Sequence, residues 1–149
     1  MVHLLRTNSA NKDFIQLVKH LDTGLAITDG ADHHFYDQFN KLDNIKFVIV
    51  AYENEMALGC GAIKEYDTTT MEIKRMYVSP IHRGKGIAKK ILIELENWAA
   101  ELSFKKCILE TGKRQTEALV LYRKNGYLSI PNYGQYVGME NSLCFEKKI

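Results

Sequence analysis

The chain has 149 residues, of which 46% are hydrophobic, 26% are charged and only two are proline. This length suits one domain, because two separate cores would each be marginal, and the apolar content excludes a disordered tail or a collagen-like rod. No apolar run approaches the roughly 20 residues that cross a membrane, and the N-terminus lacks the basic stretch and long apolar run of a signal peptide. We therefore expect one domain spanning residues 1–149, without a membrane segment.

The number and spacing of the cysteines indicate the redox state of the protein's compartment. Cys60, Cys107 and Cys144 are odd in number, widely spaced and without a CxxC pair. This pattern argues against a disulfide framework or a structural zinc site and favours the reducing cytoplasm.

The formal net charge of +2 is unevenly divided along the chain. Residues 1–74 hold seven basic and eleven acidic side chains, a net charge of −4, whereas residues 75–149 hold thirteen and seven, a net charge of +6. The basic half could hold an anionic partner, although scattered surface charge would give the same numbers.

The first half predicts a strand, helical segments and an antiparallel meander. Hydrophobic residues at three- and four-residue spacing indicate an amphipathic helix over Lys12–Leu21. The acidic stretch Asp29–Leu42 is interpreted as a second helix or a helical loop. Runs of strand-forming residues between polar turns predict strands at Leu4–Arg6, Lys46–Tyr52, Met56–Tyr66 and Met71–Val78.

The second half changes character at Ser79-Pro80, where the proline ends a strand. A long apolar stripe predicts a helix from Ile87 to Leu102, and a shorter helix over Gln115–Lys124 is stopped by Asn125-Gly126. Further strands are predicted at Lys106–Thr111, Tyr127–Ile130 and Ser142–Glu146. A meander followed by alternating strands and helices indicates an α+β (mixed α/β) fold.

The strongest chemical signal is Arg83-Gly84-Lys85-Gly86-Ile87-Ala88, between a strand and the long helix. A helix start offers unpaired N–H groups and the positive end of the macrodipole, and glycines allow close approach, so the segment predicts a phosphate or pyrophosphate cradle. A P-loop would need GxxxxGK[ST], which is absent. A dinucleotide fingerprint would need a small residue where Lys89 stands. A glycine-rich turn without a ligand is the remaining alternative.

Three segments in this order resemble the GNAT superfamily of N-acetyltransferases. The loop Arg83–Ala88 matches the family's acetyl-CoA loop, whose pattern is [Gln/Arg]-x-x-Gly-x-[Gly/Ala]. Glu72–Pro80 looks like its central strand, and Glu117–Tyr127 looks like its second conserved segment. The closing tail, from Ile130 to Glu146, is similar to one branch of small bacterial members.

The resemblance implies a central, mostly antiparallel sheet of six to seven strands, flanked by about four helices. Two parallel strands, Met71–Val78 and Lys106–Thr111, would splay apart and leave backbone groups free for the pantetheine arm of acetyl-CoA. The loop's backbone N–H groups would hold the pyrophosphate. Arg83 and Lys85 would add positive charge, and Lys89 is the weakest candidate for this role. The expected acetyl-CoA residues are Met76, Tyr77, Val78, Arg83, Gly84, Lys85, Gly86, Ile87, Ala88 and Ala118.

The resemblance also implies catalytic roles. Tyr122 would protonate the departing thiolate, because the pKa of a phenol is near that of a thiol; a core aromatic is the alternative reading. Glu72 stands where several members place a general base, with Glu110 a weaker candidate. An ion pair between Glu72 and Lys74 is the structural alternative. Strand alternation predicts Glu72, Lys74, Met76 and Val78 on one face, and Ile73, Arg75 and Tyr77 on the other.

The resemblance implies an enzyme that moves an acetyl group from acetyl-CoA to a primary amine of a small molecule or peptide, by direct transfer in a ternary complex. A non-catalytic acyl-CoA-binding module is the alternative. No metal is expected, because His33-His34 beside Asp32 lacks a third ligand at suitable spacing. Neither nucleic acid nor membrane is expected as a partner, and a homodimer is compatible with the family.

The acceptor is the part that the resemblance leaves open. Acidic residues in the first half suggest a cationic amine, and four aromatic residues could line its pocket, although each could equally be a packing cap. The acidic residues are Asp29, Asp32, Asp37 and Asp43, and the aromatic residues are Phe35, Tyr36, Tyr133 and Tyr136.

Overall fold

The computed structural model describes residues 1–29 and 45–149. All but the first residue of the predicted segment Asp29–Leu42 lies outside this range, as do the histidine pair, Phe35, Tyr36 and three of the four acidic residues assigned to the acceptor. These predictions therefore stay untested.

The described residues form seven strands and three α-helices, close to the predicted order. The first helix continues to Asp29 instead of ending at Leu21, and three described helices stand against about four expected. The strands are β1 His3–Thr7, β2 Phe47–Glu53, β3 Met56–Asp67, β4 Thr70–Val78, β5 Lys106–Gly112, β6 Leu128–Ile130 and β7 Ser142–Lys148. The helices are α1 Lys12–Asp29, α3 Ile87–Glu101 and α4 Thr116–Lys124, with short 3-10 turns η2 Pro80–His82 and η3 Gly134–Tyr136.

Helix ends follow local chemistry. At the start of α1, the backbone N–H of Phe14 donates to the side chain of Asn11 at 2.9 Å. At the end of α4, the Asn125 side chain donates to the carbonyl of Leu121 at 2.7 Å, and Gly126 adopts a positive φ of 90°. The predicted stop at Asn125-Gly126 is therefore confirmed.

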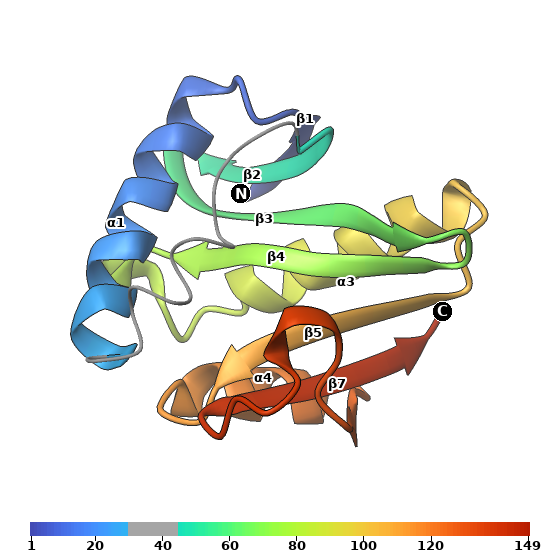
Figure 1. Ribbon diagram of the computed structural model, residues 1–149. Helices are drawn as coiled ribbons and strands as arrows, with labels where there is room; N and C mark the ends of the chain where they lie inside the picture. The colour runs from blue at the N-terminus through green and yellow to red at the C-terminus, as the bar shows by residue number, and fades with distance from the viewer. Residues whose placement is uncertain (30–44) are drawn as a thin grey trace.

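The seven strands form one sheet in the order β1-β2-β3-β4-β5-β7-β6 (Figure 1). Every neighbouring pair is antiparallel except β4 and β5. These two parallel strands pair only at their beginnings, Thr70 with Lys106 through Glu72 with Ile108. Beyond Glu72 they separate, which confirms the predicted splayed pair.

Helix α1 covers one face of the sheet, and α3 and α4 cover the other (Figure 1). Alternate residues of β2 serve the two cores: Ile49 packs into the cluster beneath α3 and α4, whereas Val48 and Val50 pack into the cluster beneath α1. A strand apolar on both faces is what a sheet covered on both sides requires.

A β-bulge in β4 corrects the predicted alternation. Between the pairs Cys60–Tyr77 and Ala62–Lys74 the register shifts, and Arg75 adopts a φ of 60°. The extra residue turns the second half of the strand over. Met76 therefore packs against the core beneath α3, on the side of Ile73, whereas Lys74 lies opposite Ala62 of the α1-side core. Met76 and Val78 do not share a face with Glu72, contrary to the prediction.

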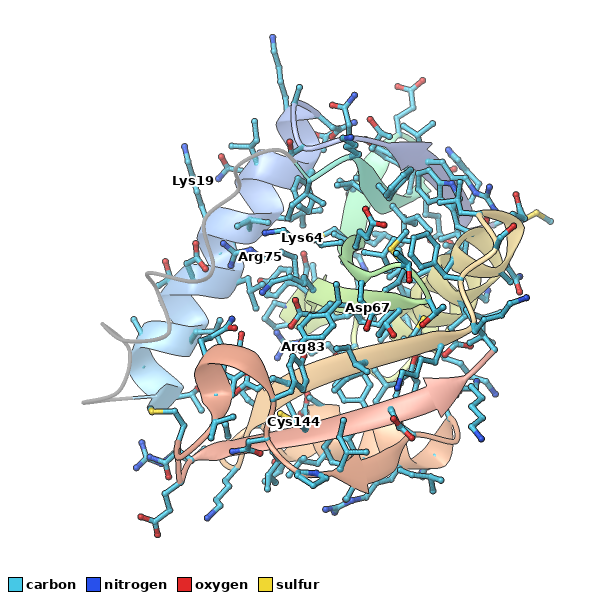
Figure 2. All side chains as sticks on the ribbon, turned by 45° about the vertical axis from the view of Figure 1, so that its right-hand side comes forward. Lys19, Lys64, Asp67, Arg75, Arg83 and Cys144 are labelled. Atoms are coloured by element: carbon cyan, nitrogen blue, oxygen red, sulfur yellow. The ribbon has the colours of Figure 1, made fainter. Side chains whose placement is uncertain are left out.

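The bulge is tied to α1 by its own side chain. Arg75 is buried, and its guanidinium donates to Asp22 Oδ1 at 2.8 Å. Figure 2 shows Arg75 beside α1, whereas Lys19 on the same helix points away from the protein. The first helix is thereby held over the place where β4 and β5 part.

Two glycines offer a test of this packing. An added Cβ on Gly59 would lie 2.6 Å from the Tyr77 carbonyl oxygen, whereas one on Gly24 in α1 would meet nothing within 4 Å. We expect Gly59→Ala to lower the free energy of unfolding by about 1–3 kcal/mol, because backbone must move. Gly24→Ala should raise it by up to about 1 kcal/mol. Urea denaturation of both variants checks the pair, and equal midpoints would contradict the expectation.

Candidate functional site

Two adjoining cavities open where β4 and β5 part. The glycine-loop cavity, about 500 Å³, lies between the end of β4, the segment Arg83–Lys89 and α4. The inter-strand cavity, about 130 Å³, lies between β4 and β5. The two share five lining residues: Leu21, Met76, Gln115, Ala118 and Tyr122.

The glycine-loop cavity gathers the predicted acetyl-CoA residues. All of them line it except Lys85, whose side chain is exposed. Gly84 and Gly86 have φ values of 78° and 79°, a left-handed conformation that glycine adopts without strain. An added Cβ at either position would meet nothing within 4 Å, so conformation and not crowding explains these glycines.

Helix α3 begins directly after this loop. The Lys90 N–H donates to the Gly86 carbonyl at 3.1 Å, which is the hydrogen bond that joins the loop to the first turn of the helix. The preceding N–H groups have no intrahelical acceptor, and the macrodipole makes this end positive, which together favour an anion. The side chains of Lys89 and Lys124 also line the cavity.

Arg83 connects the loop to β4. Its Nε donates to the Val78 carbonyl at 2.7 Å, and its guanidinium carbon lies 5.6 Å from the centre of the Tyr77 ring. The Val78 carbonyl is thus already engaged. Arg83 therefore fixes the path of the chain into the loop and also adds positive charge beside the cavity.

Tyr122 lies where the two cavities meet. It is buried, and it packs edge-to-face on Tyr127 with ring centroids 5.7 Å apart. Burial raises the pKa of Tyr122, and the negative charge of Glu110 raises it further. The phenol therefore stays neutral at neutral pH, but the shift moves its pKa away from that of a thiol and makes it a weaker acid.

A buried network supports the far side of Tyr127. The Tyr127 hydroxyl donates to Glu96 Oε2 at 2.8 Å, and Lys147 Nζ lies 2.9 Å from Glu96 Oε1. Burial, followed by the charges of Cys107 and Glu96, raises the pKa of Tyr127. Residues from α3, β7 and the end of α4 thus hold the ring against which Tyr122 packs.

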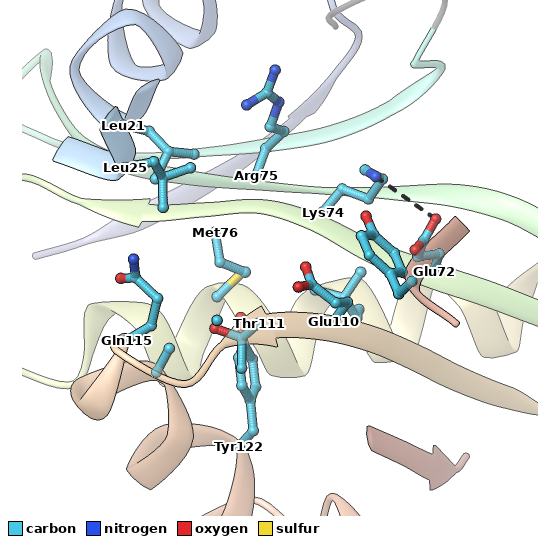
Figure 3. Close-up of a pocket in the computed structure, with 14 residues that line it drawn as sticks. Leu21, Leu25, Glu72, Lys74, Arg75, Met76, Glu110, Thr111, Gln115 and Tyr122 are labelled. Carbon is cyan, nitrogen blue, oxygen red and sulfur yellow. Dashed lines mark ion pairs between the residues drawn. The ribbon is translucent and has the colours of Figure 1, made fainter. Parts of the chain in front are cut away.

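In the described part of the chain, four charged side chains line the inter-strand cavity: Glu72, Lys74, Arg75 and Glu110. Figure 3 shows the Glu110 carboxylate pointing from β5 into the space between β5 and β4, with Glu72 and Lys74 farther along β4. Glu72 Oε2 accepts a hydrogen bond from the Tyr133 hydroxyl at 2.6 Å, and its Oε1 lies 3.8 Å from Lys74 Nζ. The ion pair considered as an alternative for Glu72 is therefore present. Burial lowers the pKa of Lys74, against the opposing effect of Glu72.

The closing loop between β6 and β7 completes this cavity. Asn132 Nδ2 donates to the carbonyls of Tyr136 and Met139 at 3.1 and 3.0 Å and so holds the loop's shape. Tyr136 lines the cavity, whereas Tyr133 reaches it through Glu72 and packs on Tyr66. Burial raises the pKa of both tyrosines.

Gln115 and Lys124 are lining residues that sequence reasoning did not single out. Gln115 lies before α4, and its buried Nε2 has no hydrogen-bond partner in the described part of the chain. Its position three residues before Ala118 was the available signal, since residues three and four apart share a helix face. His82 also lines the glycine-loop cavity.

Within residues 1–29 and 45–149, no three His, Cys, Asp or Glu side chains gather as metal ligands would. No helix in the same ranges is long and apolar enough to cross a membrane.

Comparisons with known proteins agree with this geometry. Residues 14–127 match the model of the acetyltransferase (GNAT) family. The chain is 31% identical to a protein named IAA acetyltransferase from Azospirillum brasilense, over 99% of this chain and 98% of that one. It is 35% identical to the N-acetyltransferase YsnE of Bacillus subtilis, over 66% of this chain and 67% of that one.

Solved structures share the fold. A proposed acyl-CoA N-acyltransferase from Klebsiella pneumoniae superposes with a TM-score of 0.83 at 27% identity, over 99% of this chain and 97% of that one. A GNAT family acetyltransferase from Elizabethkingia anophelis with acetyl-CoA bound superposes at 0.72 with 19% identity, over 99% and 98%. On the family match and the relative that aligns from end to end, this chain belongs to the GNAT family of acetyltransferases.

Proposed function

We propose that this acetyltransferase moves the acetyl group of acetyl-CoA to a primary amine directly, with both substrates bound at once. The observation that carries the proposal is the meeting of two cavities at Tyr122. A large cavity with a positive helix start suits the cosubstrate, and a small charged cavity suits the amine.

The residues around the glycine-loop cavity fit acetyl-CoA, which would supply the thioester. The N–H groups from Gly84 to Ala88 would hold the pyrophosphate, with Arg83 and Lys89 adding charge. The splayed end of β4, Met76 to Val78, would bind the pantetheine arm through its backbone. Lys85 is exposed and does not line the glycine-loop cavity, so it would add positive charge only from a distance.

Proton transfer would use two side chains of the site. The amine nitrogen bonds to the acetyl carbon and the carbon–sulfur bond breaks, while one amine proton leaves and the sulfur gains a proton from the Tyr122 hydroxyl. We assign the amine proton to Glu110, because its charge acts on both Tyr122 and Lys74 and its carboxylate points between the strands.

Glu72, the base that the sequence favoured, receives a supporting role in this proposal. Its carboxylate accepts the Tyr133 hydroxyl and faces Lys74. Both of its oxygens are therefore already engaged. Glu72 would instead hold Lys74 and the closing loop in position.

The test is the release of CoA thiol when the protein, acetyl-CoA and a panel of amines are mixed. Binding of acetyl-CoA without thiol release from any amine would overturn the proposal and support the acyl-CoA-binding module. The protein's own thiols should not interfere, because burial raises the pKa of Cys60 and Cys107 to about 12 and that of Cys144 to about 11.

A pair of lysines tests the cosubstrate cavity. Lys89 lines it and Lys90 does not, although both lie in the first turn of α3. We expect Lys89→Gln to weaken acetyl-CoA binding by about 3- to 10-fold, since a charge-assisted contact to phosphate is lost. Lys90→Gln should change it less than twofold, as expected for a screened surface charge. Calorimetric titration measures both, and equal effects would contradict the assignment.

A further inference from the structure

Among the described residues, the lining of the inter-strand cavity carries balanced charge. Two carboxylates, Glu72 and Glu110, stand against two cations, Lys74 and Arg75, and Arg75 is itself paired with Asp22 at 2.8 Å. A dicationic acceptor would therefore meet two cations as well as two acids. The acidic character of the first half of the chain does not extend to the described lining of this cavity.

Lys74 is the unusual member of this set. Its side chain is only 10% exposed, yet its nearest carboxylate oxygen lies 3.8 Å away, beyond hydrogen-bonding distance. No hydrogen bond from its ammonium to another described residue occurs. An ammonium has three donors, so this one can still donate to a ligand that enters the cavity and brings an acceptor.

We propose that the acceptor carries a carboxylate as well as its primary amine, and that Lys74 binds the carboxylate within the inter-strand cavity. This inference rests on the proposed function and names the substrate class of the same site. The amine then lies toward Glu110 and Tyr122, and the carboxylate lies toward Lys74, in the order that Figure 3 shows along the cavity.

Charge and size favour a carboxylate over other anionic groups. A phosphate dianion would bring two negative charges close to the carboxylates of Glu72 and Glu110 in the same cavity. A cavity of about 130 Å³ has room for a small amine-bearing group. Small amino acids, with both charges a few bonds apart, meet these conditions.

The experiment compares matched acceptors with the full chain and saturating acetyl-CoA. Alaninamide has a neutral amide where alanine has its carboxylate, and ethylamine has only a hydrogen there. Lysine and cadaverine repeat the comparison on a longer skeleton, because cadaverine is lysine without the carboxylate. Rates from CoA thiol release are corrected for the fraction of free amine. We expect kcat/KM to be at least about tenfold higher for each amino acid, mostly through KM, as a charge-assisted hydrogen bond predicts.

Lys74→Met removes the ammonium and keeps the length of the stem. It should reduce the preference for alanine over ethylamine to within about twofold, because the ratio depends on the lost hydrogen bond. Lys74→Arg should restore part of the preference. Lys64→Met is the matched control, since Lys64 is exposed on β3, opposite Glu72, and lines neither cavity. It should leave the ratio as in the unchanged protein.

The outcomes separate the two proposals. Acetylation of ethylamine and cadaverine as fast as of the amino acids would overturn the carboxylate inference and leave the proposed function standing. A Lys74→Met variant that lowers kcat for both members of a pair equally would also overturn it, since Lys74 would then act on the reaction and not on recognition. Thiol release with none of the amines would overturn the proposed function itself.

Discussion

Replacing Tyr122 by phenylalanine is expected to lower kcat by about 100-fold, the usual size of a lost general acid. The reason is positional: the buried hydroxyl lies where the two cavities meet, which is where the departing sulfur is expected. The affinity for acetyl-CoA should change less than threefold, because the ring itself is retained. Steady-state kinetics and calorimetric titration of the same variant give both numbers.

Tyr127→Phe is the matched control for this prediction. It deletes a neighbouring buried hydroxyl that lines neither cavity and donates to Glu96 at 2.8 Å. Stability should fall by about 1–2 kcal/mol, because a buried carboxylate loses a hydrogen bond, while kcat changes little. Equal losses of kcat in the two variants would show that Tyr122 acts through packing and not as an acid.

Glu110→Gln is expected to lower kcat/KM for the amine by about 100-fold near neutral pH, because the amine loses its proton acceptor. Glu72→Gln should lower kcat less than tenfold and act mainly on the KM of the acceptor, since glutamine still accepts the Tyr133 hydroxyl but no longer faces Lys74 as an anion. The two substitutions remove the same charge from the same cavity, so each is the control of the other.

The pH dependence gives the sign of this effect. As pH rises through the pKa of the free amine, more acceptor arrives unprotonated and needs less help in losing a proton. The deficit of Glu110→Gln should therefore shrink as pH rises, and pH–rate profiles of both variants measure it. A larger and more pH-sensitive loss in Glu72→Gln would return the role of base to Glu72.

Regular periodicity explains which parts of the fold could be predicted. The stripe from Ile87 to Leu102 and the apolar strands gave elements that the structure reproduces within a residue or two. The bulge could not be read in this way, because Arg75 at a positive φ carries no glycine or asparagine signal. Its position depends on long-range contacts, including the ion pair of Arg75 with Asp22.

The two cavities of the candidate site also differ in how far local sequence patterns could predict them. The glycine-loop cavity is built mainly from three short segments, at the end of β4, at Arg83–Lys89 and along α4, so much of its lining could be recognised from local spacing. The inter-strand cavity joins α1, β4, β5 and η3, which lie far apart in the sequence. The contact of Tyr133 with Glu72 spans 61 positions and leaves no local pattern.

The bulge at Arg75 also determines how this protein can vary. A substitution upstream of it changes one side chain, but losing or gaining one residue between Glu72 and Lys74 would exchange the two faces of that half-strand. The charged pair would then enter the core beneath α3, and Ile73 would turn toward α1. We therefore expect this fold to tolerate a change of side chain in this short segment better than a change in its length.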